Sequence, residues 1–359
     1  MGPPPGGVGL TGWLKKNLFS SFGSSVLTVL SVLFLAWLLP ALFGFLFQRA
    51  VWAGTPDDCR VENVGACWAF ISARGTFLIY GPYPTDQYWR VNVFFALSLA
   101  LLVPLLWPSA PFKRTNAALF FIVYPIVSFF LLHGGVFGLS EIATDQWGGL
   151  LITFLLSVVG ITGSFPIGVL LALGRRSKLP IVKAFCILFI ELWRAVPLIT
   201  VLFMASVMLP LFMPEGTNVD RLLRAMIGLT LFYSAYMAEV IRGGLQALPR
   251  GQYEAASALG LSYWKSMTFI IMPQALTLVI PGIVGNFISL LKDTSLVAII
   301  GIFDLLNAVK AINSDAAWAT PTKAVTSYVF AALLFFVLCF AISRYSLFLE
   351  KRLRVGHKR

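Results

Sequence analysis

Charged side chains are scarce in this sequence, in which Asp, Glu, Lys and Arg make up 12% of 359 residues. Soluble domains contain roughly a quarter charged residues and at most about half apolar residues, whereas this chain is 58% hydrophobic. The composition therefore excludes a water-soluble enzyme, a disordered chain and a collagen-like chain. Only two histidines and four cysteines are present, so the clustered ligands of a catalytic metal site are lacking. No GxxxxGK[ST] motif occurs, which excludes ATP binding by a P-loop in this chain.

What the sequence does contain is a series of long stretches without Asp, Glu, Lys or Arg. A membrane-spanning helix needs about 20 predominantly apolar residues. Seven stretches are long enough, at residues 17–48, 91–112, 115–140, 146–174, 195–214, 266–291 and 324–343. An eighth, between Arg224 and Arg242, is apolar apart from Glu239. The sequence thus predicts an all-α polytopic membrane protein with about eight transmembrane helices.

The distribution of basic residues predicts the orientation of these helices. Lys and Arg concentrate in cytoplasmic segments because their translocation is disfavoured. If the N-terminus is inside, most of the 27 Lys and Arg residues fall in the inside segments. We therefore expect both termini to be cytoplasmic, and we interpret the net charge of +12 as an orientation signal. A nucleic-acid-binding surface is the weaker interpretation.

The spacing of the spans suggests three parts. Residues 1–20 are rich in Gly and Pro between positions 3 and 7 and are predicted to form a flexible cytoplasmic tail. Residues 21–140 contain the first three predicted spans and a periplasmic loop. A glycine-rich break at residues 133–145 separates this N-terminal extension from residues 141–359, which contain the other five predicted spans.

Two cysteines lie in the first outside loop. Cys59 and Cys67 are eight residues apart, and in an oxidising compartment such a pair is expected to form a disulfide. In the chain-entropy model, closing so short a loop contributes roughly 2.5 kcal/mol to stability. Two free thiols are the alternative. Cys186 and Cys339 fall in or beside apolar spans, and we interpret them as inert packing residues.

A short segment between the sixth and seventh predicted spans carries the most informative pattern. Residues 248–261 have Pro249 near the start, Gly260 near the end and an Ala-rich interior, which predicts a helix of about two to three turns. A helix this short and polar cannot span the membrane, but one tethered at both ends can transmit motion from a cytosolic partner. Tyr253, Ala256 and Leu259 are spaced three residues apart, so with Gly260 they are expected to form one contact face.

Four motifs in chain order give the sequence a family resemblance. They are Glu191-Leu192-Trp193-Arg194 with Pro197-Leu198, then Ala235-Tyr236 with residues 238–244, then Glu254-Ala255-Ala256 with Gly260 and residues 269–275, and finally residues 292–296. The third motif resembles the EAA loop of permease subunits of binding-protein-dependent ABC importers, and the others are similar to the polar amino-acid family. The last five spans resemble the core of a type I importer permease. The N-terminal extension resembles the longer permease subunit of broad-specificity L-amino-acid importers.

The resemblance implies a function and a set of partners. The chain would be a permease subunit in the bacterial inner membrane, translocating L-amino acids by alternating access. In this family two separate ATPase subunits bind ATP and Mg, and a periplasmic binding protein delivers the amino acid. This chain would then be no enzyme, would hold no cofactor or metal of its own and would contact lipid but no nucleic acid. A second, homologous permease subunit is also implied, with a heterodimer favoured.

The resemblance and the residues together suggest roles for individual side chains. The expected contacts with an ATPase subunit are Tyr253, Glu254, Ala255, Ala256, Leu259 and Gly260. Glu254 would make polar contacts there and Gly260 would permit close approach; a solvated carboxylate is the alternative for Glu254.

Two charged pairs are expected to be structural. Glu191 and Arg194 are three residues apart, and Glu239 and Arg242 repeat that spacing. On one helix face such residues can pair, which lowers the cost of placing charge at the membrane edge.

The seventh predicted span is the leading candidate for lining a substrate pathway. It contains Pro273, Pro281, Gly282 and Gly285, and such residues free backbone groups that need protein or water as partners. The predicted pathway residues are Pro197, Thr200, Asn286, Ser289 and Lys292. Because Asn286 and Ser289 are neutral, the pattern favours neutral or mixed amino acids. The alternative, of equal weight, is that both side chains bond to neighbouring helices.

Three other functions fit the sequence less well. A self-contained secondary transporter of small polar solutes predicts inverted repeats and a buried ionisable residue, but the sequence shows no clear repeat. A membrane-embedded enzyme predicts a His, Ser or Asp constellation within the spans, where only His133 is available. An ABC exporter is disfavoured by the EAA-like loop.

Overall fold

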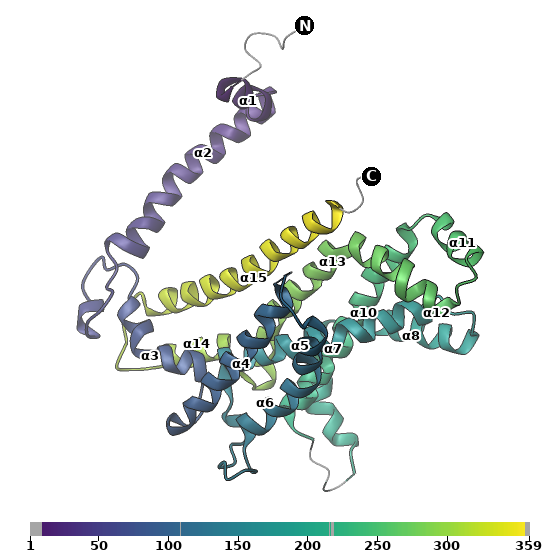
Figure 1. Ribbon diagram of the computed structural model, residues 1–359. Helices are drawn as coiled ribbons and strands as arrows, with labels where there is room; N and C mark the ends of the chain where they lie inside the picture. The colour runs from purple at the N-terminus through teal and green to yellow at the C-terminus, as the bar shows by residue number, and fades with distance from the viewer. Residues whose placement is uncertain (1–8, 108, 215, 217–218, 356–359) are drawn as a thin grey trace. The chain divides into compact units, whose positions relative to one another are not determined.

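The computed structural model describes residues 9–107, 109–214, 216 and 219–355 (Figure 1). Its α-helices are α1 (Leu10–Asn17), α2 (Phe22–Phe43), α3 (Trp68–Tyr80), α4 (Tyr88–Leu106), α5 (Lys113–Ala118), α6 (Tyr124–His133), α7 (Leu150–Arg175), α8 (Pro180–Ala195), α9 (Leu198–Phe203), α10 (Arg221–Ala247), α11 (Arg250–Ala258), α12 (Tyr263–Ser266), α13 (Met272–Asp293), α14 (Leu305–Asn313) and α15 (Lys323–Val355). The strands are β1 (Gly148–Gly149) and β2 (Phe303–Asp304). Short π-helical turns continue α2, α5, α9 and α12.

The predicted all-α polytopic class is confirmed. In the described part of the chain, six helical segments are long and apolar enough to span a membrane: Phe22–Gln48, Thr85–Leu106, Lys113–His133, Leu150–Arg175, Tyr263–Ile300 and Lys323–Leu353. A seventh results if α8 and the segment that starts with α9 count as one broken span. Two of the eight predicted spans therefore differ from the structure.

The first difference is the start of the predicted span at residues 195–214. The structure instead has α8 ending at Ala195 and α9 beginning at Leu198, with a bend of 102° between the two helices. Val196 is extended, with φ −105° and ψ 135°, as expected for a residue before proline. Pro197 therefore separates the two helices, and the predicted span corresponds to the second of them, while α8 as the first half of a broken span was not predicted.

The second difference is α10, the predicted span interrupted by Glu239. α10 has 27 residues and is long enough to cross a bilayer at about 1.5 Å per residue. It is not among the apolar spans, and four charged residues lie along it: Arg221, Arg224, Glu239 and Arg242. Its surroundings are other helices, since it packs against α7, α8 and α13.

The chain folds into two compact units. One comprises the residues up to Ala73 together with Asp315–Tyr328, and the other comprises Arg74–Ser314 and the residues from Val329 onward. The boundaries of these units differ from those of the two parts predicted at residues 21–140 and 141–359. The division into an N-terminal extension and a permease core therefore stays a prediction.

The first unit contains α1, α2 and a disulfide-bonded loop. α1 occupies part of the predicted flexible tail, while the Pro- and Gly-rich residues 1–8 lie outside the described chain. A disulfide joins Cys59 and Cys67, as expected. The Arg60 Nη2 donates to the Ala317 carbonyl at 3.1 Å, and the Cys67 N–H donates to Thr326 Oγ1 at 3.0 Å. These bonds hold the loop against the segment that leads into α15.

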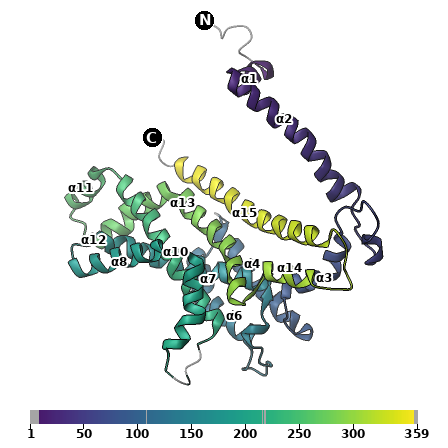
Figure 2. The ribbon, with the colours of Figure 1, turned by 180° about the vertical axis from the view of Figure 1, so that it is seen from behind.

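The second unit is built around α10. Figures 1 and 2 show α7, α8, α10 and α13 grouped together, with α11 beyond their ends. The α7–α10 contact is close because of small residues. A Cβ on Gly168 would lie 2.6 Å from Met237 Cβ, so only glycine permits this backbone separation. Around this contact, residues of α7, α8, α10 and α13 form a buried apolar cluster that includes Ala238 and Ile241.

A small parallel sheet ties two distant parts of this unit together. Gly149 of β1 pairs with Asp304 of β2, and the Leu305 N–H donates to Thr153 Oγ1 of α7 at 3.1 Å. The Asp304 carboxylate is fully buried and caps α14 by accepting from the N–H groups of Leu306 and Asn307, both at 3.0 Å. Burial outweighs these bonds and raises the pKa of Asp304 to about 6.

Candidate functional site

α11 is a short helix of nine residues at the location predicted from residues 248–261. Pro249 precedes its first turn, where a missing N–H costs nothing. Gly260 has φ +67°, and its N–H donates to the Ser257 carbonyl while the Leu261 N–H donates to the Ala256 carbonyl. This pair of bonds is a Schellman motif, which favours glycine at the left-handed position. The sequence therefore fixes both ends of α11 locally.

The inner side of α11 is bonded to α7 and α10. The Tyr253 hydroxyl donates to the Leu245 carbonyl of α10 at 2.9 Å and accepts from Arg176 Nη1 at 2.8 Å. Arg176 follows α7, and it also donates to the Leu245 carbonyl at 3.2 Å. The Ala256 side chain is buried. These contacts join α11 to the ends of two long helices.

The other side of α11 is exposed. Glu254, Ala255 and Gly260 are exposed, and Leu259 has 74% of its surface accessible. The expected contact face of Tyr253, Ala256, Leu259 and Gly260 is thus divided, because Tyr253 and Ala256 point inward. Among the described residues, none has an atom within 4 Å of a Cβ built on Gly260, so no contact among them requires glycine there.

A network of five charged residues, which we call the ion-pair network, joins α7, α8 and α10. It consists of Arg175 of α7, Glu191 and Arg194 of α8, and Glu239 and Arg242 of α10. Arg242 Nη2 lies 2.7 Å from Glu239 Oε2, as the spacing predicts. Arg194 and Glu191 are farther apart, at 3.9 Å, so that predicted pair is the weaker one.

Arg175 is the member that the sequence pattern did not reveal. Its Nη1 lies 2.9 Å from both Glu191 Oε1 and Glu239 Oε1, so it joins the two predicted pairs. In the sequence Arg175 belongs to a basic cluster with Arg176, which we used only as an orientation signal. The sequence did contain one clue. Arg175 and Arg176 lie at the end of one predicted span, and the two carboxylate–arginine pairs lie near the ends of others, so an arginine from the first could have been expected to join them.

The predicted pathway residues lie on two broken or irregular helices. Pro197 and Thr200 are exposed at the start of α9, directly after the 102° bend. Ser289 is half-buried on α13, and Lys292 is exposed near its end. Asn286, also on α13, has its Nδ2 buried without a hydrogen-bond partner among the described residues. A buried amide donor without a partner is costly, so this position favours a polar group or water beside it.

Asp293 and Tyr233 form a contact that the sequence analysis missed. The Tyr233 hydroxyl of α10 donates to Asp293 Oδ2 at the end of α13, with a separation of 2.5 Å. The bond gives the Asp293 carboxylate, which follows Lys292, a hydrogen-bond donor. It also joins α13 to α10. Because these residues are 60 positions apart, no local spacing could have linked them.

These features define a class: a polytopic helical membrane protein with a short polar helix held outside the spans and a helix broken within one of them. Comparison with known proteins places the chain more narrowly. Residues 164–355 match the family described as "Binding-protein-dependent transport system inner membrane component". The chain belongs to this family, and within it to the amino-acid ABC importer permeases.

Two relatives match nearly the whole chain. The inner membrane amino-acid ABC transporter permease protein YhdY of Escherichia coli is 51% identical over 346 residues, covering 96% of this chain and 93% of the relative. The glutamate/glutamine/aspartate/asparagine transport system permease protein BztC of Rhodobacter capsulatus is 40% identical over 422 residues, covering 99% and 96%. The matches therefore include the N-terminal extension as well as the family core.

A solved structure matches the core alone. It is described as the crystal structure of an amino acid ABC transporter with histidines, is 30% identical and has a TM-score of 0.50. The match covers 57% of this chain and 92% of the solved chain. The similarity supports the assignment of an ABC importer permease fold.

Proposed function

We propose that this chain is the subunit through which an ABC importer moves L-amino acids across a bacterial inner membrane, with both termini in the cytoplasm. The amino-acid transport named for both whole-length relatives supports this substrate class. The concentration of Lys and Arg in alternate connecting segments supports the orientation. The finer choice among amino acids rests on Asn286 and Ser289, whose neutrality favours neutral or mixed substrates.

The observation that carries the proposal is the two-sided character of α11. Its exposed side, with Glu254, Ala255, Leu259 and Gly260, is available to an ATPase subunit. Its inner side is bonded through Tyr253 to Arg176 and to the Leu245 carbonyl. Closure of a pair of ATPase subunits would push α11, and the push would reach α7 and α10. In this arrangement ATP and Mg are bound by the partners and this chain has no ATPase site.

Alternating access would follow from two packings of the same helices. A loaded periplasmic binding protein would favour one packing and the ATPase pair the other, since a partner shifts a conformational equilibrium by its differential affinity. A second, homologous permease subunit would supply the opposite wall of the pathway, with a heterodimer favoured. On this chain the pathway would pass Pro197, Thr200, Asn286, Ser289 and Lys292.

Co-purification in mild detergent tests the coupling role. The test variant carries Glu254→Lys and Gly260→Asp. The control variant carries Glu62→Lys and Gly138→Asp, which change another exposed glutamate and another exposed glycine with positive φ that has nothing within 4 Å of a built Cβ. We expect an ATPase subunit to accompany the wild type and the control but to be lost from the test variant.

Substrate uptake in reconstituted vesicles completes the test. ATP-dependent uptake of an L-amino acid, abolished in the test variant, supports an importer. Retention of the ATPase by the test variant would contradict the coupling role. Uptake without any ATPase, driven by an ion gradient, would instead support the secondary-transporter alternative.

A further inference from the structure

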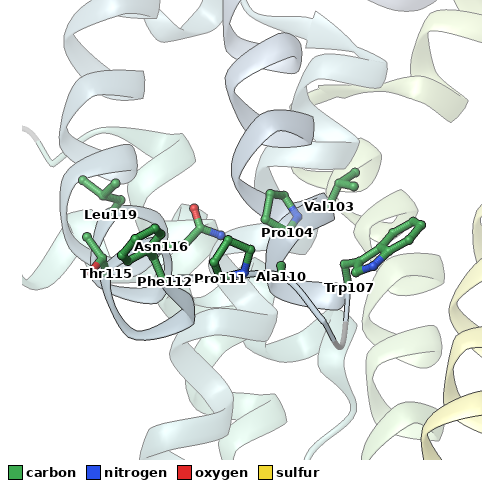
Figure 3. Close-up of a pocket in the computed structure, with 9 residues that line it drawn as sticks. All are labelled: Val103, Pro104, Trp107, Ala110, Pro111, Phe112, Thr115, Asn116 and Leu119. Atoms are coloured by element: carbon green, nitrogen blue, oxygen red, sulfur yellow. The ribbon is translucent and has the colours of Figure 1, made fainter.

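A shallow groove lies where α4 ends and α5 begins, outside every element assigned to coupling or transport. Its volume is about 500 Å³. Figure 3 shows its lining side chains, among them Val103 and Trp107 from the end of α4 and Phe112 and Leu119 from the start of the next span. Its amide, Asn116 Nδ2, already donates to the Leu101 carbonyl at 2.7 Å. The groove therefore presents a mainly apolar surface.

A second groove shares lining residues with the first. Its volume is about 410 Å³, and it is lined by Val103, Leu106, Trp107, Tyr345 and Phe348. The Tyr345 hydroxyl donates to the Leu106 carbonyl at 3.1 Å, so α15 is fixed against the end of α4. The two grooves share Val103 and Trp107, and we call them together the Trp107 groove. Because the lining side chains are mainly apolar, the groove suits a hydrocarbon chain better than a polar solute.

Basic residues stand close in sequence to residues that line the Trp107 groove. Those that are exposed are Lys113, Arg114, Arg344, Lys351 and Arg352. On α15, Arg344 lies four residues before Phe348 and Arg352 four residues after it, so both share the helix face that lines the groove. In residues 97–119 and 340–353 the sequence has one acidic residue, Glu350, against these five basic ones. The groove is thus an apolar surface with a positively charged edge.

The Trp107 groove opens on the same membrane face as α11. The span Lys113–His133 and the span Leu150–Arg175 lie between the turn at residue 107 and Arg176, and two crossings return the chain to its starting side. Arg176 bonds to Tyr253 of α11. Trp107 and Phe112 are both exposed at the ends of spans, where aromatic residues occupy the interface between lipid and water.

We propose that the Trp107 groove binds an anionic glycerophospholipid from the leaflet on the side of α11. An acyl chain lies against Val103, Trp107 and Phe348, and the phosphate contacts the basic side chains around it. The apolar surface alone would accept any acyl chain. The charges make the site selective, since each Lys or Arg near a membrane surface strengthens binding of an anionic lipid by roughly fivefold.

Fluorescence quenching in lipid nanodiscs tests the proposal with the full chain. The discs contain phosphatidylcholine with a small fraction of either brominated phosphatidylglycerol or brominated phosphatidylcholine. The signal of Trp107 is the difference between the wild type and Trp107→Phe. We expect brominated phosphatidylglycerol to quench this signal at a several-fold lower mole fraction than brominated phosphatidylcholine, and 1 M salt to remove the difference.

Charge substitutions then separate the site from the general surface. Lys113→Gln with Arg352→Gln should reduce the preference for phosphatidylglycerol by at least about fivefold. The control, Lys178→Gln with Lys183→Gln, removes two exposed basic residues on the same membrane face and should leave the preference unchanged. Equal quenching by both lipids, or an equal effect of the two variants, would show ordinary annular lipid and overturn the proposal. No quenching by either lipid would show that a protein segment covers the groove, which also overturns it.

Discussion

Replacement of Glu239 by glutamine tests the ion-pair network most directly. The Glu239 side chain is 15% exposed and accepts hydrogen bonds from Arg242 Nη2 at 2.7 Å and from Arg175 Nη1 at 2.9 Å. Glutamine keeps the shape of the side chain but removes the charge, and its amide nitrogen must face a guanidinium group. The change therefore leaves Arg175 and Arg242 with less compensation in a largely buried position.

The expected magnitude follows from this burial. Hydrogen bonds to charged groups contribute about 1.5–3 kcal/mol each, and breaking a buried ion pair costs about 3–5 kcal/mol. Because Glu191 remains within 2.9 Å of Arg175, part of the charge is still compensated. We expect a loss of about 2–4 kcal/mol, which for a chain of 359 residues corresponds to a decrease of roughly 3 to 5 °C in the unfolding midpoint.

Glu191→Gln is the matched control. Glu191 contacts the same Arg175 nitrogen at the same 2.9 Å, but its side chain is 53% exposed. An exposed ion pair contributes at most about 1 kcal/mol, so the midpoint should change by no more than about 1 to 2 °C. Thermal unfolding of the detergent-solubilised chain, followed by tryptophan fluorescence, measures both variants. Equal losses in the two variants, or a smaller loss in Glu239→Gln, would refute burial as the source of the effect.

Three further predictions concern other parts of the chain. Burial raises the pKa of Asp304 from 3.8 to about 6, so the folded state binds a proton on this carboxyl group more tightly than the unfolded state does. Protonation of Asp304 therefore stabilises the fold fully below about pH 4, and this stabilisation is lost as the pH rises through 6. Unfolding midpoints at pH 4.5 and 7.5 should show the wild type losing stability relative to Asp304→Asn, by roughly 3 kcal/mol over the whole titration; parallel curves would contradict this assignment. Cys59→Ser with Cys67→Ser should cost about 2.5 kcal/mol, and a reducing agent should lower the wild-type midpoint to that of the variant. Gly260→Ala should cost about 1–2 kcal/mol because φ is positive there, whereas Gly251→Ala, inside the helix, should stabilise α11. Amide hydrogen exchange of α11 measures both effects. Similar exchange in the two variants would argue against positive φ as the reason for glycine at position 260.

The local sequence was sufficient for the parts of the structure that depend on neighbouring residues. The ends of α11 follow from Pro249 and Gly260, because helix termination is decided within a few residues. Long apolar stretches likewise predicted the six spans, since a bilayer requires length and hydrophobicity in one continuous segment. The break at Pro197 also follows from a local rule, because the residue before a proline is held extended, but α8 was not predicted as part of the same span because charged residues interrupt its sequence.

Contacts between distant segments were decided only by the tertiary structure. The spacing of Glu239 and Arg242 indicated their pairing, but Arg175 reaches the same carboxylate from another helix, and Tyr233 meets Asp293 in the same way. The inward direction of Tyr253 depends on where α7 and α10 end relative to α11, and the Trp107 groove needs α15 beside α4. A sequence specifies periodicity, charge and caps directly, because these act within one or two turns. Which faces meet depends on how all the helices pack at once, and no single stretch contains that information.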